Sequence, residues 1–298
     1  MDELRFDGRV AIVTGAGRGI GRAHALLLAA RGAKVVVADF GVEVDGTGSS
    51  TGPAQEVVAD IEAAGGEAVP CYASVADEPG ADAIVRTALD TYGRLDVLIN
   101  NAGISDPAPF EELSVGQFRR MIDVHFFGTL LCTRAAWPHM KQAGYGRIVC
   151  TMSESVLGGI AELTSYASGK GAVLGFMRAL ATEAEGTGIL VNAVVPRAFT
   201  RMSAGHAFEG LPQEEVDRFA AMLAPELNSP AAIFLAHESC PLNGELLRAG
   251  MGSVARLAIV HTKGLVADGI TVEDIAEHLD TILDVTDATV TSTKPLVR

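Results

Sequence analysis

Residues 10–21 read VAIVTGAGRGIG, and the apolar stretch AHALLLAARG follows directly after Arg22. The run Val10–Thr14 predicts a short buried strand, the glycines predict a tight turn, and the alanine- and leucine-rich stretch predicts a helix. Glycines let the backbone come close to a pyrophosphate, which is held by the free N–H groups at the helix start. This order predicts a dinucleotide-binding α/β fold, with cofactor contacts from Gly15, Gly17, Arg18, Gly19, Ile20 and Gly21.

The next apolar run, Lys34–Ala38, ends in Asp39, eighteen residues after Gly21. A carboxylate at the end of this strand can accept hydrogen bonds from both hydroxyls of an adenosine ribose, and it repels a 2′-phosphate. This position therefore predicts NAD rather than NADP, although Arg18 supplies a basic group that partly offsets the repulsion. The alternative is that Asp39 only caps the end of the strand.

Two further short strands are expected over residues 68–72 and 96–100. In an open parallel sheet, the loops at the carboxyl ends of the strands line the ligand crevice. The residues placed there by the sequence, as walls for the adenine and ribose, are Ser74, Val75, Asn101, Ala102 and Gly103.

Tyr166 and Lys170 occur in the sequence YASGK, and Ser153 lies thirteen residues before the tyrosine. On a helix, the phenol and the ammonium project from one face, one turn apart. Two unit charges about 4 Å apart interact by roughly 4 kcal/mol at an effective dielectric constant of 20, or about three pKa units. Lys170 is therefore expected to lower the pKa of Tyr166 so that it acts as a general base, while Ser153 hydrogen-bonds the substrate oxygen. Such a spacing alone also occurs by chance on many helices.

The order of T-G-x-x-x-G-x-G, N-N-A-G, Ser153 and Y-x-x-x-K resembles the short-chain dehydrogenase/reductase family over roughly residues 6–250. The resemblance implies a Rossmann-type, doubly wound parallel sheet of about seven strands. It implies one domain over residues 1–298, with a C-terminal extension at 251–298. It also implies hydride transfer with a nicotinamide, with Tyr166 as the proton-transfer residue and Lys170 on the nicotinamide ribose. Further cofactor contacts implied by the resemblance are Pro196, Phe199 and Thr200.

Three longer stretches, RFDGRVAIVTGAG, RAAWPHMKQAGYGRI and LAHESCPLNGELLRAGMG, give a closer resemblance. They are similar to the dehydrogenase part of peroxisomal D-bifunctional (multifunctional) enzymes and their bacterial single-domain relatives. This resemblance implies NAD-dependent oxidation of (3R)-3-hydroxyacyl-CoA. The alternatives are a 17β-hydroxysteroid or other bulky-alcohol dehydrogenase, and, from a different class, a catalytically silent dinucleotide-binding sensor or scaffold.

Two positions depart from the wider family pattern. His125 stands where most members have Asn; it either holds a water against Lys170 and extends a proton path, or is a helix histidine bonded to a backbone carbonyl. Arg197 follows Pro196 where Gly is usual. We expect Arg197 to form a salt bridge within a lid over the substrate, and contact with a CoA phosphate is the alternative.

The composition limits the partners. A net charge of −14 argues against nucleic acid and anionic membranes, so any phosphate must be held locally. Four cysteines without a C-x-x-C pair favour a reducing, cytoplasmic setting over a disulfide framework. No histidine has the spacing of a metal ligand, so no metal is expected. We expect neither a signal peptide nor a membrane span.

The remaining pattern gives the organisation. Helices are expected over residues 114–141, kinked at Pro138, and over 165–185. By resemblance, these two helices pair in a homodimer or homotetramer, and a monomer is the alternative. A glycine-rich rim is expected at 41–53, a mobile lid at 199–223, final strands within 240–260, and a last helix at 272–283. The threonine-rich end is expected to fray or to pack on a neighbouring subunit.

Overall fold

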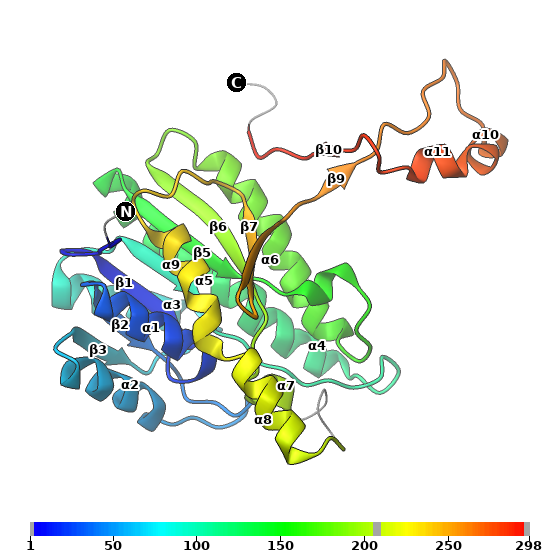
Figure 1. The fold of residues 1–298 in the computed structure, drawn as a ribbon. Coiled ribbons are helices and arrows are strands. Elements are labelled where there is room, and N and C mark those ends of the chain that lie inside the picture. The colour runs from blue at the N-terminus through cyan, green and yellow to red at the C-terminus, as the bar shows by residue number, and fades with distance from the viewer. Residues whose placement is uncertain (1–2, 205–209, 295–298) are drawn as a thin grey trace.

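The computed structural model describes residues 3–204 and 210–294, and its centre is a sheet of eight strands in the order β3-β2-β1-β4-β5-β6-β7-β8 (Figure 1). Every neighbouring pair is parallel except β7 and β8, which are antiparallel. The chain runs outward from β1 to β3 and then crosses back to β4, so the doubly wound sheet expected from the sequence is confirmed. The strands are β1 Val10–Thr14, β2 Lys34–Ala38, β3 Glu67–Cys71, β4 Val97–Asn100, β5 Gly146–Thr151, β6 Ile189–Pro196, β7 Leu246–Gly250 and β8 Ser253–Leu257.

Helices cover both faces of the sheet (Figure 1). Successive side chains of a strand point to opposite faces, so Ala11 and Val13 of β1 belong to one core and Val10 and Ile12 to the other. The first core is closed by α1 Gly19–Ala30, α2 Gly52–Ala63 and α9 Ser229–Ala236. The second core is closed by α3 Glu78–Tyr92, α5 Gly128–Ala143 and α6 Thr164–Glu183.

The long helix expected over residues 114–141 is present as three consecutive segments. Ser114 and Gln117 form a capping box at the start of α4 Val115–Met121, and a π-helical segment, η1 Ile122–Phe127, leads into α5. Pro138 lies inside α5, which continues to Ala143. Single π-helical turns inside α-helices often occur at functional sites, and this one carries His125.

The lid region is only partly described, because residues 205–209 lie outside the described residues. Its described parts are α7 Arg201–Ala204 and α8 Gln213–Met222, which leads through the 3-10 turn Pro225–Asn228 to α9. By length and apolar composition, Gln213–Ala236 is the one helical stretch in the described chain that could cross a membrane. In this structure it is broken into separate elements, and the apolar side chains of α9 are buried in the core.

The C-terminal extension projects away from the sheet (Figure 1). It contains β9 Val260–His261, α10 Val272–Glu277, α11 Leu279–Leu283 and β10 Thr289–Val290, and β9 pairs with β10 in antiparallel fashion. The single helix expected over residues 272–283 is wrong, because the chain leaves helical geometry at His278 and neither short helix buries a residue. Without a packed face, little holds such a helix together.

The threonine-rich end packs on its own chain. Arg178 of α6 donates a hydrogen bond to the Thr291 carbonyl at 3.2 Å, and the Thr182 hydroxyl donates to the Thr293 carbonyl at 2.7 Å. Thr293 also lies against Gly244, where any Cβ would clash with it. Up to Lys294, therefore, the end is held against its own chain rather than frayed, and packing on a neighbouring subunit stays a prediction.

His24 of α1 is fully buried, with Nδ1 at 2.8 Å from the Ser229 hydroxyl, and burial lowers its pKa from 6.5 to about 3. Below pH 6.5, therefore, the histidine is protonated in the unfolded chain but stays neutral in the folded chain. Its contribution to the free energy of unfolding is complete above pH 6.5 and is lost as the pH falls. One such group costs about 1.4 kcal/mol per pH unit.

We expect His24→Gln, which can still reach Ser229 but does not titrate, to reduce the fall in unfolding free energy between pH 7 and pH 5 by about 2 kcal/mol. Urea unfolding at several pH values measures this change. His139→Gln, at an exposed position, is the matched control. An unchanged slope for His24→Gln would contradict the assignment.

Candidate active site

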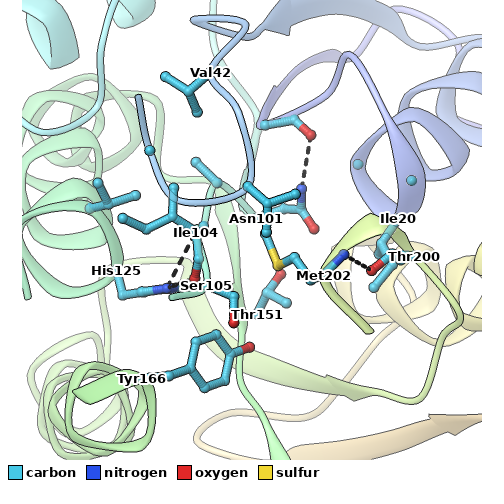
Figure 2. A pocket seen from close by; sticks show the side chains of 18 of the residues that line it. Ile20, Val42, Asn101, Ile104, Ser105, His125, Thr151, Tyr166, Thr200 and Met202 are labelled. Atoms are coloured by element: carbon cyan, nitrogen blue, oxygen red, sulfur yellow. Dashed lines mark hydrogen bonds between the residues drawn. The ribbon is translucent and has the colours of Figure 1, made fainter. Parts of the chain in front are cut away.

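A cleft of about 820 Å³ opens at the carboxyl ends of the parallel strands (Figure 2). The glycine loop, the end of β2, the loops after β3 and β4, and the helix carrying Tyr166 and Lys170 all contribute to its wall. The structure therefore brings the glycine loop predicted to bind a pyrophosphate and the Tyr166–Lys170 pair into one cavity.

The glycine loop after β1 is packed too closely for larger residues. A Cβ on Gly21 would lie 2.1 Å from the Gly15 carbonyl and 2.4 Å from the Asn101 amide. Gly15 and Gly19 have positive φ angles of 62° and 53°, which favour glycine. The loop thus delivers the start of α1, with its unpaired N–H groups and positive dipole end, to the cleft, as an anionic pyrophosphate requires.

Asp39 follows β2 and lines the same cleft. One carboxylate oxygen accepts a hydrogen bond from the Gly17 N–H and the other from the Gly41 N–H, both at 2.7 Å. The strand-end cap considered from the sequence is therefore present. Each carboxylate oxygen has further lone pairs, so the cap leaves acceptor capacity for ribose hydroxyls.

The loop after β4 is attached to the glycine loop. The Asn101 side-chain amide donates to the carbonyls of Thr14 and Gly15 at 3.0 and 3.1 Å, and the Thr14 hydroxyl accepts from the N–H groups of Asn101 and Ala102. Ser74, Val75, Asn101, Ala102 and Gly103 all line the cleft, as the sequence predicts.

Ser153, Tyr166 and Lys170 also line the cleft. Ser153 caps the 3-10 turn Glu154–Leu157, and its hydroxyl accepts the Ser155 N–H at 3.2 Å. Lys170 is buried, and its ammonium donates to the Thr151 carbonyl at 2.7 Å and lies 5.7 Å from the centre of the Tyr166 ring. The Ser153 hydroxyl, which follows β5, and the phenol and ammonium carried by α6 therefore lie in one wall of the cleft.

The protonation of these groups is set mainly by burial. Burial raises the pKa of Tyr166 above its usual value, and a hydrogen bond with Ser153 opposes this increase. Burial lowers the pKa of Lys170 to about 8. The expected lowering of the Tyr166 pKa by Lys170 is not seen in this structure, in which the Lys170 ammonium donates to the Thr151 carbonyl.

His125 packs against the ring of Tyr166 (Figure 2). Its ring meets the Tyr166 ring edge-on, with centroids 4.9 Å apart, and its Nε2 lies 2.8 Å from the Ile104 carbonyl. Burial and the nearby Lys170 charge lower the pKa of His125 well below 6.5, so the ring is neutral. The hydrogen bond to a backbone carbonyl is one of the two arrangements weighed from the sequence; the proton path stays a prediction.

Two of the predicted cofactor contacts do not line the cleft. Gly17 instead donates its N–H to Asp39, and Phe199 donates its N–H to the Leu223 carbonyl. The predicted contacts Arg18, Gly19, Ile20, Pro196 and Thr200 do line it. A motif read along the chain does not show which of its residues face the cleft.

The glycine-rich segment 41–53, for which the sequence predicts a rim, forms part of the cleft wall. In the structure, Val42, Glu43, Val44 and Gly46 line the cleft. The Ser105 N–H donates to the Val44 carbonyl at 2.8 Å, and Arg201 of α7 lies 3.2 Å from Glu43. The segment therefore joins the cofactor side to the substrate side. Glycine content predicted a loop here but could not show where the loop folds.

The far wall of the cleft is mostly apolar and comes from Ile104, Val124, Ile160, Leu163 and Met202. Charged residues also line the cleft there, among them Arg120, which lies 2.9 Å from Asp106, and Asp123, Glu162 and Arg201. In the part of the chain that the structure describes, no group of three or more His, Cys, Asp or Glu side chains could hold a metal ion.

A family model described as short chain dehydrogenase matches residues 9–207. Two curated relatives align over 96% of the chain. Peroxisomal multifunctional enzyme type 2 of Drosophila melanogaster is 40% identical, with 47% of its length covered. A putative short-chain type dehydrogenase/reductase of Mycobacterium tuberculosis is 39% identical, with 98% covered. The chain thus spans about half the length of the multifunctional relative and nearly all of the mycobacterial one.

Solved structures show the same likeness. The full-length peroxisomal multifunctional enzyme type 2 from Drosophila melanogaster superposes with a TM-score of 0.78 at 33% identity, covering 97% of this chain and 48% of that chain. A 7α-hydroxysteroid dehydrogenase complexed with NADH and 7-oxo glycochenodeoxycholic acid superposes with a TM-score of 0.73 at 30% identity, covering 85% and 98%.

We expect Gly21→Ala to weaken binding of nicotinamide dinucleotides by at least tenfold, because the added Cβ would force the glycine loop away from Gly15 and Asn101. A fluorescence titration with the reduced dinucleotide measures this loss. Gly116→Ala, in the exposed first turn of α4 with no neighbour closer than 3.7 Å, is the control. Equal affinities for Gly21→Ala and the control would contradict the role of the loop.

Proposed function

The chain belongs to the short-chain dehydrogenase family of oxidoreductases that act on CH–OH groups, and we propose that it interconverts (3R)-3-hydroxyacyl-CoA and 3-oxoacyl-CoA with NAD. The observation that supports this most is the convergence of the glycine loop, Asp39, Ser153, Tyr166 and Lys170 on one cleft. The apolar far wall of the cleft favours an acyl substrate, as does the resemblance of three sequence stretches to the dehydrogenase part of D-bifunctional enzymes.

The residues present fit a nicotinamide dinucleotide, because the closely packed glycine loop leaves backbone N–H groups where a pyrophosphate needs them. When bound, this cofactor supplies the hydride acceptor. Gly19 and Gly21 would hold the pyrophosphate, Asp39 the adenosine ribose, and Lys170 the nicotinamide ribose. The structural neighbour described as complexed with NADH supports the same class of cofactor.

In the proposed mechanism, the protein handles the proton. The Ser153 hydroxyl holds the substrate oxygen, and Tyr166 accepts the hydroxyl proton during oxidation or returns it during reduction. Since burial raises the pKa of Tyr166, the phenol is protonated near neutral pH, ready to donate to a ketone oxygen. Its anionic, proton-accepting form increases as pH rises, so alcohol oxidation should accelerate toward alkaline pH.

Tyr166→Phe should abolish turnover, because the proton acceptor is lost, while affinity for NADH stays within about twofold of the wild type. We would assay NADH formation with a panel of (3R)-hydroxyacyl-CoA esters, (3S) isomers and hydroxysteroids, between pH 7 and pH 10. Turnover of the (3R) esters that increases with pH supports the proposal.

Preferred turnover of hydroxysteroids would favour the bulky-alcohol alternative. Tight NAD binding without turnover of any alcohol would favour the silent sensor. Undiminished activity of Tyr166→Phe would contradict the mechanism itself.

The preference for NAD is proposed from Asp39. A carboxylate next to a 2′-phosphate is unfavourable by about 1 kcal/mol in water and by several kcal/mol in a partly enclosed cleft. We expect Asp39→Asn, which keeps an acceptor for one backbone N–H, to change the ratio of NAD to NADP affinity by at least tenfold toward NADP. Comparative titrations of both cofactors measure it, with Asp45→Asn in the same loop as the control. A wild type that prefers NADP would overturn the role given to Asp39.

We also propose that the protein is a homodimer or homotetramer in the cytoplasm. The C-terminal extension carries exposed apolar side chains that a second copy could cover, among them Val260, Val266, Val272, Leu279 and Leu283. All four cysteines are buried and unpaired, consistent with a reducing compartment. Sedimentation velocity and imaging of a tagged chain test the two proposals separately.

A further inference from the structure

Arg197 has no role in the function proposed above, yet it lies between two parts of the active site. It directly follows Pro196, which lines the cleft, and its side chain reaches back to Glu154, which directly follows Ser153. We propose that the Arg197–Glu154 ion pair positions Ser153 for the reaction. This inference rests on the proposed function, because it assumes that the Ser153 hydroxyl holds the substrate oxygen.

The Arg197 backbone is firmly anchored. Its N–H is shared between the Ala249 carbonyl at 2.8 Å and the side-chain oxygen of fully buried Asn228 at 2.9 Å. The Asn228 amide donates back to the Arg197 carbonyl at 3.1 Å, and Gly250 packs so closely that a Cβ there would lie 2.4 Å from that carbonyl. The position of Arg197 is therefore set by the carboxyl end of β7 and by Asn228 just before α9.

The guanidinium contacts Glu154 at two points. Its Nε and Nη2 donate to different carboxylate oxygens, the second at 2.9 Å, and Arg248 of β7 adds a cation at 3.9 Å. Exposed single-contact salt bridges contribute little, but a two-point contact to a carboxylate fixes direction as well as distance. The Glu154 side chain is only 25% exposed, which limits screening by solvent.

Glu154 is the first residue of the 3-10 turn that Ser153 caps. On the other side, this turn is held by Ser155, which is buried and whose N–H donates to the Ser153 hydroxyl. Beyond it, Gly158 and Gly159 both adopt positive φ angles, and Leu157 is exposed. The ion pair thus ties the Ser153 turn to the chain directly after β6.

The location of the pair favours positioning over ligand binding. The Arg197 guanidinium is occupied by Glu154, and neither residue is among those that line the cleft. The lid salt bridge expected from the sequence is therefore wrong in its partner, because Glu154 belongs to the turn after β5. The alternative of a CoA phosphate remains an outcome for the experiment.

The test compares Arg197→Met, Glu154→Gln and the double variant. We expect kcat to fall by about tenfold in each single variant, since misplacing a reacting group by 1 Å can cost about 100-fold. The affinity for NADH should stay unchanged. The double variant should lose no more than either single variant, because both remove the same interaction.

The matched control is the ion pair of Arg256 with Glu245, which also makes two contacts, both at 2.7 Å, and has similar exposure, 50% and 25%. It joins β8 to the residue before β7, away from the cleft. Arg256→Met and Glu245→Gln should leave kcat unchanged. If they reduce kcat as much, or if the losses in the Arg197 and Glu154 variants multiply, the inference is wrong. An increased KM for acyl-CoA at unchanged kcat would overturn it in favour of a phosphate contact.

A second measurement does not depend on turnover. The four native cysteines are buried, so Ser153→Cys provides a thiol in the cleft that small alkylating reagents can label. We expect Arg197→Met in this background to change the labelling rate by at least threefold and Arg256→Met to leave it unchanged. Equal labelling rates of Ser153→Cys with and without Arg197→Met would refute the inference, even if the protein turned over no alcohol. A wild type without activity would refute only the proposed function.

Discussion

The active site depends on the close packing of the glycine loop against the loop after β4. β1 and β4 lie side by side in the sheet, and Thr14 and Asn101 exchange hydrogen bonds across their carboxyl ends. Gly21 fits beneath Gly15 and Asn101 only because it has no side chain. This contact brings the positive end of α1 to the loop that leads to His125. The glycine loop, which is predicted to bind a pyrophosphate, and the loop after β4 are therefore held together by one set of close contacts.

A second contact fixes the chemical side. Lys170 is buried and donates to the Thr151 carbonyl at the end of β5, so α6 cannot shift along the sheet without losing a charged hydrogen bond. Tyr166, one turn earlier, is then held against the His125 ring. The π-helical segment η1 places that ring next to Gly103 and Gly169. A Cβ on Gly103 would lie 2.6 Å from the His125 ring, so this position needs glycine. The position of the Tyr166 phenol thus depends more on backbone geometry and close packing at glycines than on contacts between charged groups.

The predictions that succeeded rest on local patterns. Val10–Thr14 and Lys34–Ala38 form strands with the expected bounds, and Ser153, Tyr166 and Lys170 share one cleft. Those that failed needed partners distant in the chain. The helix expected over residues 272–283 breaks because neither of its two parts buries a residue, and the pKa of Tyr166 rises because burial outweighs the hydrogen bond with Ser153. Arg197 pairs with Glu154, 43 positions away in the chain, which no local pattern could indicate.

By themselves, periodicity and glycine positions determined the strand, turn and helix of residues 10–30, and the order of motifs that resembles the family determined the doubly wound sheet. The same motifs single out Ser153, Tyr166 and Lys170, and their part in proton transfer stays a prediction. Only the tertiary structure decided where segment 41–53 folds, which groups share the Asp39 carboxylate, and that Glu154, next to Ser153, pairs with Arg197. These features depend on distances between residues that are far apart in the chain. Such distances are set by the packing of the whole sheet and its helices.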